Sequence, residues 1–234
     1  MKISRSSRGS SFSHIIYFSP GEIDEICEKE LKKAQMLPDS PKAIDIERFV
    51  EFHLECTLDY GASVPDGVLG YTCFSATGKP EMVGISSSID DGTSFGRRRV
   101  RSTFAHEAGH CVLHPLLFME NTQSTLAGHN IDFAQKRILC RDSDFQKFKG
   151  GYDGRWWEYQ ANCAIGGFLL PKKLVQLVAE NFLTSTGRMG LKVLDDSGRK
   201  AALKEVAEIF DVGAAAAGIR LDQLFPVRPA EDFL

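Results

Sequence analysis

The stretch RSTFAHEAGHCVLHP, residues 101–115, contains the pattern HEAGH, which is typical of helices that bind a catalytic metal ion. Residues four apart lie on one face of a helix, so His106 and His110 can present two imidazoles to one ion. Glu107 projects beside them, where its carboxylate can act on a water molecule rather than on the metal. The pattern also recurs in helices that bind no metal, so it predicts a site only together with a third ligand.

The helix that carries this pattern follows a series of short strands. Three segments with apolar residues at a period of two precede it, separated by glycine and proline turns: residues 56–63, 67–75 and 80–89. From about Gly96 the pattern becomes helical, and Pro115 ends the helix because proline cannot continue a helix interior. Earlier helices are predicted at residues 20–37 and 40–55. Together these elements predict an α+β fold with a small antiparallel sheet.

A third ligand is available in WWEYQANCAIGGFLLPKKL, residues 156–174, which is predicted to be helical up to Pro171. Glu158 and Asn162 share one face of this helix. Glu158 can complete a His-His-Glu site for one zinc ion and leave the fourth position open for water, as catalytic zinc sites do. Asn162 can orient a ligand histidine by accepting the N–H of its imidazole ring.

Two further residues of the metal helix need explanation. Gly109 lies in the helix interior, where glycine costs about 1 kcal/mol relative to alanine, and this cost is explained if another backbone packs closely there. His114 repeats the four-residue step but lies two turns from His106, too far along the axis to share one ion. We therefore expect His114 to pack or to form hydrogen bonds.

The stretches RSTFAHEAGHCVLH and EYQANCAIGGFLLP resemble the two motifs of the ImmA/IrrE family of metallopeptidases, and the resemblance covers residues 43–171. It implies a gluzincin-like zinc protease fold in which His106, His110 and Glu158 bind zinc and Glu107 is the catalytic base. It also implies a protein substrate, a helix-turn-helix transcriptional repressor. Ala164 and Ile165 stand where the family has phenylalanine and alanine, which alters packing but not the ligands.

The spacing between the two motifs is longer than is usual in that family, because Glu158 follows His110 by 48 positions. The insertion, at about residues 115–155, mixes aromatic residues, glycines and charges, and is either a lid or specificity element or a surface excursion packed by its own aromatics. No histidine follows His129, so the group that stabilises the oxyanion is open. Candidates are Tyr159, Tyr152 and His129.

The C-terminal segment, residues 199–227, has two helical periods around Asp211 to Gly213 and the outline of a helix-turn-helix. Its second helix offers mainly Arg220 and Gln223 to a DNA groove, so we expect it to pack or to dock a repressor rather than to bind DNA directly. The basic run GRRRVR, residues 96–101, is interpreted as a solvated helical face, with a partner carboxylate or phosphate as the alternative.

The composition excludes several other classes of protein. The net charge is -3, from 28 basic and 31 acidic residues, so there is no general attraction to nucleic acid or anionic lipid. The six cysteines are scattered, and no segment is apolar enough for a secretory signal or a membrane span, which predicts a cytoplasmic protein. We expect a flexible polar lead at residues 1–20, a metallopeptidase domain at 21–183 and a C-terminal helical segment at 184–234.

Two function classes are compatible with these patterns. One is a zinc endopeptidase that cleaves a repressor, and the other is a non-catalytic zinc-binding regulator or antitoxin-like module that binds DNA or a repressor stoichiometrically. Glu107 favours the enzyme, since a binding module needs no general base between two histidines. For the enzyme, the strand before the metal helix, residues 80–88, is expected to offer a free edge to which an extended peptide adds.

Overall fold

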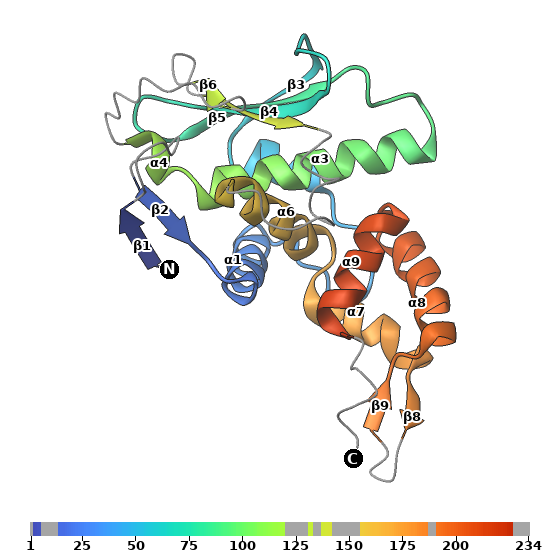
Figure 1. Cartoon of the computed structure of the whole chain (residues 1–234). Coiled ribbons are helices and arrows are strands. Elements are labelled where there is room, and N and C mark those ends of the chain that lie inside the picture. Colours follow the sequence, from blue (N-terminus) through green and yellow to red (C-terminus); the bar gives the residue numbers. More distant parts are fainter. Residues whose placement is uncertain are drawn as a thin grey trace.

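The computed structural model describes residues 2–5, 14–119, 131–132, 137–141, 155–186 and 191–226. It has an α+β fold in which a small sheet covers one side of a long helix, α3 (Ser94–Leu113), and other helices cover the opposite side (Figure 1). The HEAGH residues therefore lie on a helix between two layers. In this position every face of α3 near the pattern is covered, and its residues from Thr103 to Cys111 are buried.

The main sheet has the strand order β3-β5-β4-β7-β6 and is mixed, not antiparallel as the sequence predicts. Only the pair β3 and β5 is parallel among its four pairings. The strands are β3 (Thr57–Ala62), β4 (Val68–Phe74), β5 (Pro80–Ser86), β6 (Ile131–Asp132) and β7 (Arg137–Arg141).

The expectation that the strand before α3 has a free edge is wrong. After β4 the chain turns back and enters between β3 and β4, so β5 forms backbone hydrogen bonds on both sides. Its last four residues, Val83 to Ser86, are all buried, as in strands covered on both faces. Gly84 has no side chain because the ring of Tyr71 on β4 fills that space, 2.1 Å from where a Cβ would be.

The N-terminal region contains a strand pair and a helix. Strands β1 (Lys2–Arg5) and β2 (His14–Tyr17) pair antiparallel, and α1 (Pro20–Lys33) follows. Ser19 and Glu22 form a capping box at the start of α1, with Pro20 at its first position. The next predicted helix starts later than residue 40: α2 (Ile46–Arg48) begins after the cap Asp45 and continues as a π-helical turn, η1 (Phe49–His53).

The second helical layer is formed by α6 (Trp156–Leu169), which packs along α3. The two helices approach closely at Gly109, where an added Cβ would lie 2.8 Å from Ala164 Cβ and 3.1 Å from Ala161 Cα. The prediction that a backbone packs against Gly109 is thus confirmed. Shorter elements follow α3 and α6: α4 (Leu116–Met119), α7 (Lys172–Ala179) and η2 (Glu180–Phe182).

The C-terminal segment forms a small hairpin of strands, β8 (Thr184–Thr186) and β9 (Leu191–Val193), and then two helices, α8 (Asp196–Ile209) and α9 (Ala214–Leu224). The turn between the helices includes Asp211, whose φ of 49° is left-handed. Arg220 is buried, and it donates to the carbonyl of Leu170 and pairs with Asp24 of α1. Arg220 therefore joins α9 to the rest of the protein and is not presented at its surface.

All six cysteines are free thiols, and all except the half-buried Cys73 are buried. Cys111 and Cys163 follow His110 and Asn162 directly in α3 and α6. Within the described ranges, no helix combines the length and the apolar character needed to cross a membrane.

Candidate metal centre

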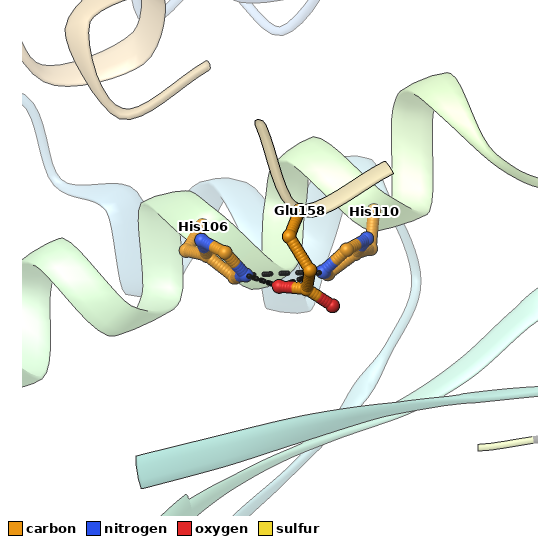
Figure 2. A group of neighbouring side chains, drawn as sticks. All are labelled: His106, His110 and Glu158. Carbon is orange, nitrogen blue, oxygen red and sulfur yellow. Dashed lines mark hydrogen bonds and ion pairs between the residues drawn. The ribbon is translucent and has the colours of Figure 1, made fainter. Parts of the chain in front are cut away.

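Helices α3 and α6 bring the side chains of His106, His110 and Glu158 together (Figure 2). The two histidine Nε2 atoms are 3.0 Å apart, and Glu158 Oε2 lies 3.1 Å from His106 Nε2 and 3.7 Å from His110 Nε2. All three side chains are at most 3% exposed. Two imidazole nitrogens and a carboxylate oxygen thus converge on one point and could hold a metal ion.

Small residues where α3 and α6 cross allow the three side chains to converge. Gly109 and Ala161 allow the two helix backbones to approach closely, within about one turn of the three side chains. His106 and His110 lie on the same face of α3, and Glu158 lies one turn before Asn162 on α6. A larger residue at the crossing would move the carboxylate away from the two rings.

The charge of Glu158 is set by its neighbours. Burial raises the pKa of this carboxyl group, but the adjacent His110 and His106 lower it more, so its pKa lies well below the usual range and the group is ionised. Glu158 Oε2 contacts both rings, whereas no described residue forms a hydrogen bond with Oε1. A buried carboxylate oxygen without a hydrogen-bond partner is costly unless another group binds it.

The outer nitrogen of each histidine also has a partner. His106 Nδ1 lies 3.0 Å from Asn162 Oδ1. Because a carbonyl oxygen only accepts, Nδ1 carries a hydrogen, and Nε2 is the ring nitrogen that faces the site. His110 Nδ1 lies 3.0 Å from His114 Nδ1, and His114 Nε2 lies 3.1 Å from Gln160 Oε1.

His114 is a hydrogen-bonding residue in the core, in agreement with its prediction. It is fully buried between α3 and α6 and next to the ring of Trp156. Burial, together with the adjacent His110, lowers the pKa of His114 to about 3, so the ring is neutral near pH 7. Neither His114 nor Gln160 is among the residues that the sequence patterns assign to the site.

Glu107 lies on the side of α3 that faces the sheet. Its Oε2 accepts a hydrogen bond of 2.6 Å from the hydroxyl of Thr72 on β4. One carboxylate oxygen of Glu107, one ring nitrogen of His106 and the sulfur of Cys140 lie within 4.8 Å of one another. Glu107 therefore stands next to the group of three donors, where it can exchange a proton with a molecule bound there.

The sequence patterns did not reveal Thr72 or Cys140, which face Glu107 from the sheet. A threonine in an otherwise buried strand is a signal for a polar partner, but which partner it meets depends on the packing of the sheet on α3. Gly70, also on β4, allows this contact, since a Cβ there would lie 3.1 Å from Glu107 Oε1.

Of the three candidates for oxyanion stabilisation, Tyr159 alone lies within the described residues. Tyr159 follows Glu158 directly, so its side chain points about 100° around α6 from the carboxylate. Burial, together with its neighbour Cys163, raises the pKa of Tyr159 to about 12. Tyr152 and His129 lie outside the described residues, as does most of the predicted insertion.

A cleft of about 530 Å³ lies between α3, α6 and α9. None of His106, Glu107, His110 and Glu158 lines it, and it adjoins the candidate site only through Asn162, whose side chain contacts His106. Its walls are mainly apolar, with Ile165 from α6 and Ile219 from α9, and Arg98 contributes a charged group.

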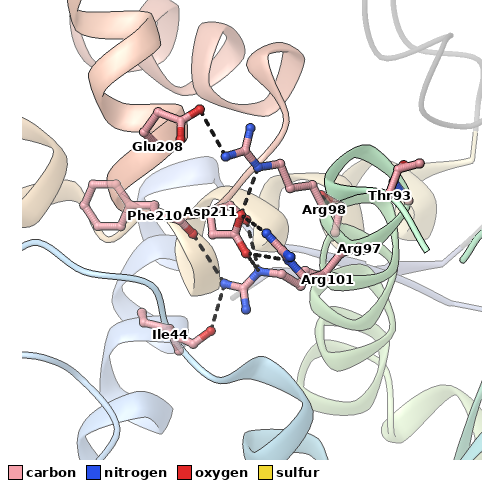
Figure 3. A network of polar contacts seen from close by, with 10 residues as sticks. Ile44, Thr93, Arg97, Arg98, Arg101, Glu208, Phe210 and Asp211 are labelled. Carbon is pink, nitrogen blue, oxygen red and sulfur yellow. Dashed lines mark hydrogen bonds and ion pairs between the residues drawn. The ribbon is translucent and has the colours of Figure 1, made fainter. Parts of the chain in front are cut away.

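The basic run at the start of α3 pairs with the turn between α8 and α9, and we call these residues the arginine cluster: Arg97, Arg98, Arg101 and Asp211 (Figure 3). Arg97 and Arg98 donate to the Asp211 carboxylate, and Arg98 also contacts Glu208. Arg101 donates to the backbone carbonyls of Ile44, Phe210 and Asp211. The interpretation as a solvated face fits only Arg97, whose side chain is 60% exposed; Arg98 and Arg101 are 20% and 11% exposed, and Asp211 is the partner carboxylate of the alternative.

No model of a known protein family matches the chain, and a search of curated proteins gives no significant match. The chemistry that the site can support is therefore inferred from its geometry. Two imidazoles and an ionised carboxylate form a buried cluster that could hold a metal ion, and a second carboxylate lies beside it.

Proposed function

We propose that this chain is a gluzincin-type zinc endopeptidase that cleaves a helix-turn-helix transcriptional repressor. The observation that carries the proposal is the convergence of His106, His110 and Glu158 with Glu107 beside them. The resemblance of both motifs to the ImmA/IrrE family supports the same reaction and is the basis for the choice of substrate.

The donor set fits zinc. Histidine nitrogens and a carboxylate oxygen are ordinary zinc ligands, and ligands about 2.0 to 2.1 Å from a tetrahedral ion are about 3.3 Å apart. The three donor separations, 3.0, 3.1 and 3.7 Å, bracket that value. The ionised Glu158 also supplies the negative charge that a buried cation requires. Three protein ligands leave a fourth position for water or substrate, as in catalytic sites.

When bound, zinc would supply Lewis-acid chemistry by polarising a peptide carbonyl and making a water molecule more acidic. Glu107 accepts a proton from the attacking water and transfers it to the amide nitrogen as the C–N bond breaks. Thr72 holds the carboxylate of Glu107 on the sheet side, and Asn162 holds His106. Because these groups are buried and hydrogen-bonded, the base and one ligand are already oriented.

The cleft between α3, α6 and α9 supports a protein substrate. It is large enough for one or more side chains, and its apolar walls favour an apolar side chain of the substrate. Since α9 forms one wall, the C-terminal helices take part in the choice of substrate. This role agrees with their interpretation as a repressor-docking element.

The test separates metal binding from chemistry. We expect the purified protein to bind about one zinc ion and His110→Ala to lose it, as measured by metal analysis. We expect Glu107→Gln to retain zinc and to lower cleavage at least about 100-fold, the usual effect of losing a general base. The substrates assayed are helix-turn-helix repressor candidates sought among the neighbouring genes, and Glu180→Gln, at an exposed position of η2, is the matched control.

Each outcome contradicts or supports a separate part of the proposal. Full zinc occupancy in His110→Ala would contradict the metal site. Unchanged cleavage in Glu107→Gln would contradict the role of the base. A zinc-loaded wild-type protein that binds the repressor tightly without cutting it would identify a stoichiometric regulator instead.

A further inference from the structure

A chain of hydrogen bonds runs from the candidate ligand His110 to the backbone of the N-terminal strand pair. His110 Nδ1 is 3.0 Å from His114 Nδ1, His114 Nε2 is 3.1 Å from Gln160 Oε1, and Gln160 Nε2 is 2.8 Å from the carbonyl oxygen of Ile16 on β2. All four residues are at most 3% exposed. The chain therefore joins three elements, α3, α6 and β2, without contact with bulk water.

The direction of every hydrogen bond in this chain is fixed at the Ile16 end. A backbone carbonyl can only accept, so the Gln160 atom 2.8 Å away must be its NH₂ group. The other end of the amide is then an oxygen, which also only accepts. It faces His114 Nε2, which must carry the hydrogen.

The same logic continues through the two rings. A neutral imidazole has one N–H, so His114, with its hydrogen on Nε2, presents a lone pair at Nδ1. His110 Nδ1 must then donate to it across the 3.0 Å contact. His110 Nδ1 thereby keeps a hydrogen whether or not the ring is charged, and Nε2, which faces His106 and Glu158, is the nitrogen left to bind a metal ion.

We infer that His114 and Gln160 are positioning residues that hold the hydrogen of His110 on Nδ1, so that Nε2 is the nitrogen available at the metal position before any metal binds. This inference rests on the proposed function. Without this chain of hydrogen bonds, His110 would exchange between two tautomers. One of them places an N–H where a metal ligand must have a lone pair. The polar partners behind a metal-binding histidine usually change affinity by about 10- to 100-fold when removed.

The first test observes the tautomers directly in the zinc-free protein. Long-range ¹H–¹⁵N correlation spectra of ¹⁵N-histidine-labelled protein distinguish a protonated Nδ1 from a protonated Nε2. We expect the hydrogen of His110 on Nδ1 and that of His114 on Nε2. A His110 ring with its hydrogen on Nε2, or in exchange between both forms, would overturn the inference regardless of activity.

The second test measures zinc affinity by competition with a chelator. His114→Asn keeps an acceptor close to the position of Nδ1, and we expect affinity near that of the wild type. His114→Leu removes the acceptor for His110 Nδ1, and Gln160→Leu removes the oxygen that accepts from His114 Nε2. For both variants we expect zinc binding to weaken by about 10- to 100-fold. Gln176→Leu on α7, which is not part of this chain of hydrogen bonds, is the matched control.

The outcomes distinguish this inference from the proposed function. A wild-type protein that binds no zinc contradicts the proposed function, while the tautomer spectrum still decides the inference. Wild-type affinity in both leucine variants contradicts the inference and leaves the zinc site intact. If His114→Leu does not fold, Gln160→Leu and the spectrum of the unmutated protein still give the answer.

Discussion

Gly109 shows how one missing side chain positions the candidate site. It stands between His106 and His110 in the sequence of α3, and an added Cβ would meet Ala164 at 2.8 Å and the Ala161 backbone at 3.1 Å. Alanine is the better helix former by about 1 kcal/mol. The close contact opposes that gain, since a backbone cannot move aside as the end of a side chain can.

We expect Gly109→Ala to lower the free energy of unfolding by about 1 to 3 kcal/mol, the usual cost of overpacking a core. The control is Gly218→Ala in the middle of α9, where the new Cβ would lie 3.4 Å from the end of the Leu203 side chain. There we expect no loss, or a gain of up to about 1 kcal/mol. Urea denaturation of metal-free protein measures both, and equal stability of the two variants would contradict the role of Gly109.

The sequence predicts those site residues whose geometry is local. His106, His110 and Glu107 are neighbours because the helical repeat makes them so. Thr72 meets Glu107 across 35 positions, and Gln160 meets Ile16 across 144. Such contacts depend on how the sheet and β2 pack on the helices, and a residue pattern within one element carries no information about that.

At the scale of elements, the hydrogen bonds and ion pairs of the arginine cluster join α3 to the turn between α8 and α9. Burial alone would raise the pKa of Asp211, but hydrogen bonds from Arg97 and Arg98 outweigh it and lower the pKa below its ordinary value. Ionised Asp211 therefore stabilises the fold. That contribution is complete above the unfolded pKa of about 4 and is lost as the pH falls through the folded value.

We expect Asp211→Asn to lower the free energy of unfolding by about 1 to 3 kcal/mol at pH 7, the range for hydrogen bonds to charged groups. Asparagine tolerates the left-handed backbone as aspartate does, so the change tests the charge. The difference from wild type should begin to shrink below about pH 4 and disappear only below the lowered pKa of folded Asp211, where both side chains are neutral. Denaturation between pH 3 and pH 8 checks this, with Glu208→Gln as the more exposed control; a difference independent of pH would contradict it.

The order of the strands is the part of the fold that the sequence did not predict. Each of β3, β4 and β5 occurs close to its predicted residues, because alternation and turn residues are local signals. The insertion of β5 between β3 and β4 is a choice among alternative pairings. Burial of β5 on both faces favours this order, but a run such as Val83 to Ile85 fits an edge or an interior position equally well before the sheet is assembled.

At the scale of the whole molecule, the C-terminal helices pack onto the part of the protein that holds the candidate site. Arg220 joins α9 to α1, the arginine cluster joins the α8–α9 turn to α3, and α9 lines the cleft. Arg220, the one basic side chain of α9, is thereby buried and not available to DNA. In the proposed protease, the exposed parts of these helices are a surface on which a folded partner can be selected.

We expect the protein to cut one repressor efficiently and unrelated unfolded proteins poorly, because the choice of substrate depends on surfaces that a generic peptide does not fill. Initial cleavage rates of the repressor candidate and of casein, measured with the same zinc-loaded protein, check this. Shortening the segment between about residues 121 and 149 should weaken repressor cleavage and leave zinc content unchanged. Casein digestion as fast as the best repressor candidate would contradict a dedicated protease.

The rates at which the buried cysteines react with a thiol reagent report on local opening of the fold. Burial raises the pKa of Cys111 strongly, and that of Cys163 to about 11, so neither thiol is reactive while the core around it stays packed. Cys111 lies near Cys56 and Thr72, whereas Cys163 lies near Tyr159 and Arg220, so the two thiols report on different parts of the core. A thiol reagent reaches each of them only when its surroundings open transiently, so each labelling rate gives the free energy of that local opening. The half-buried Cys73, which is closer to solvent, is the reference.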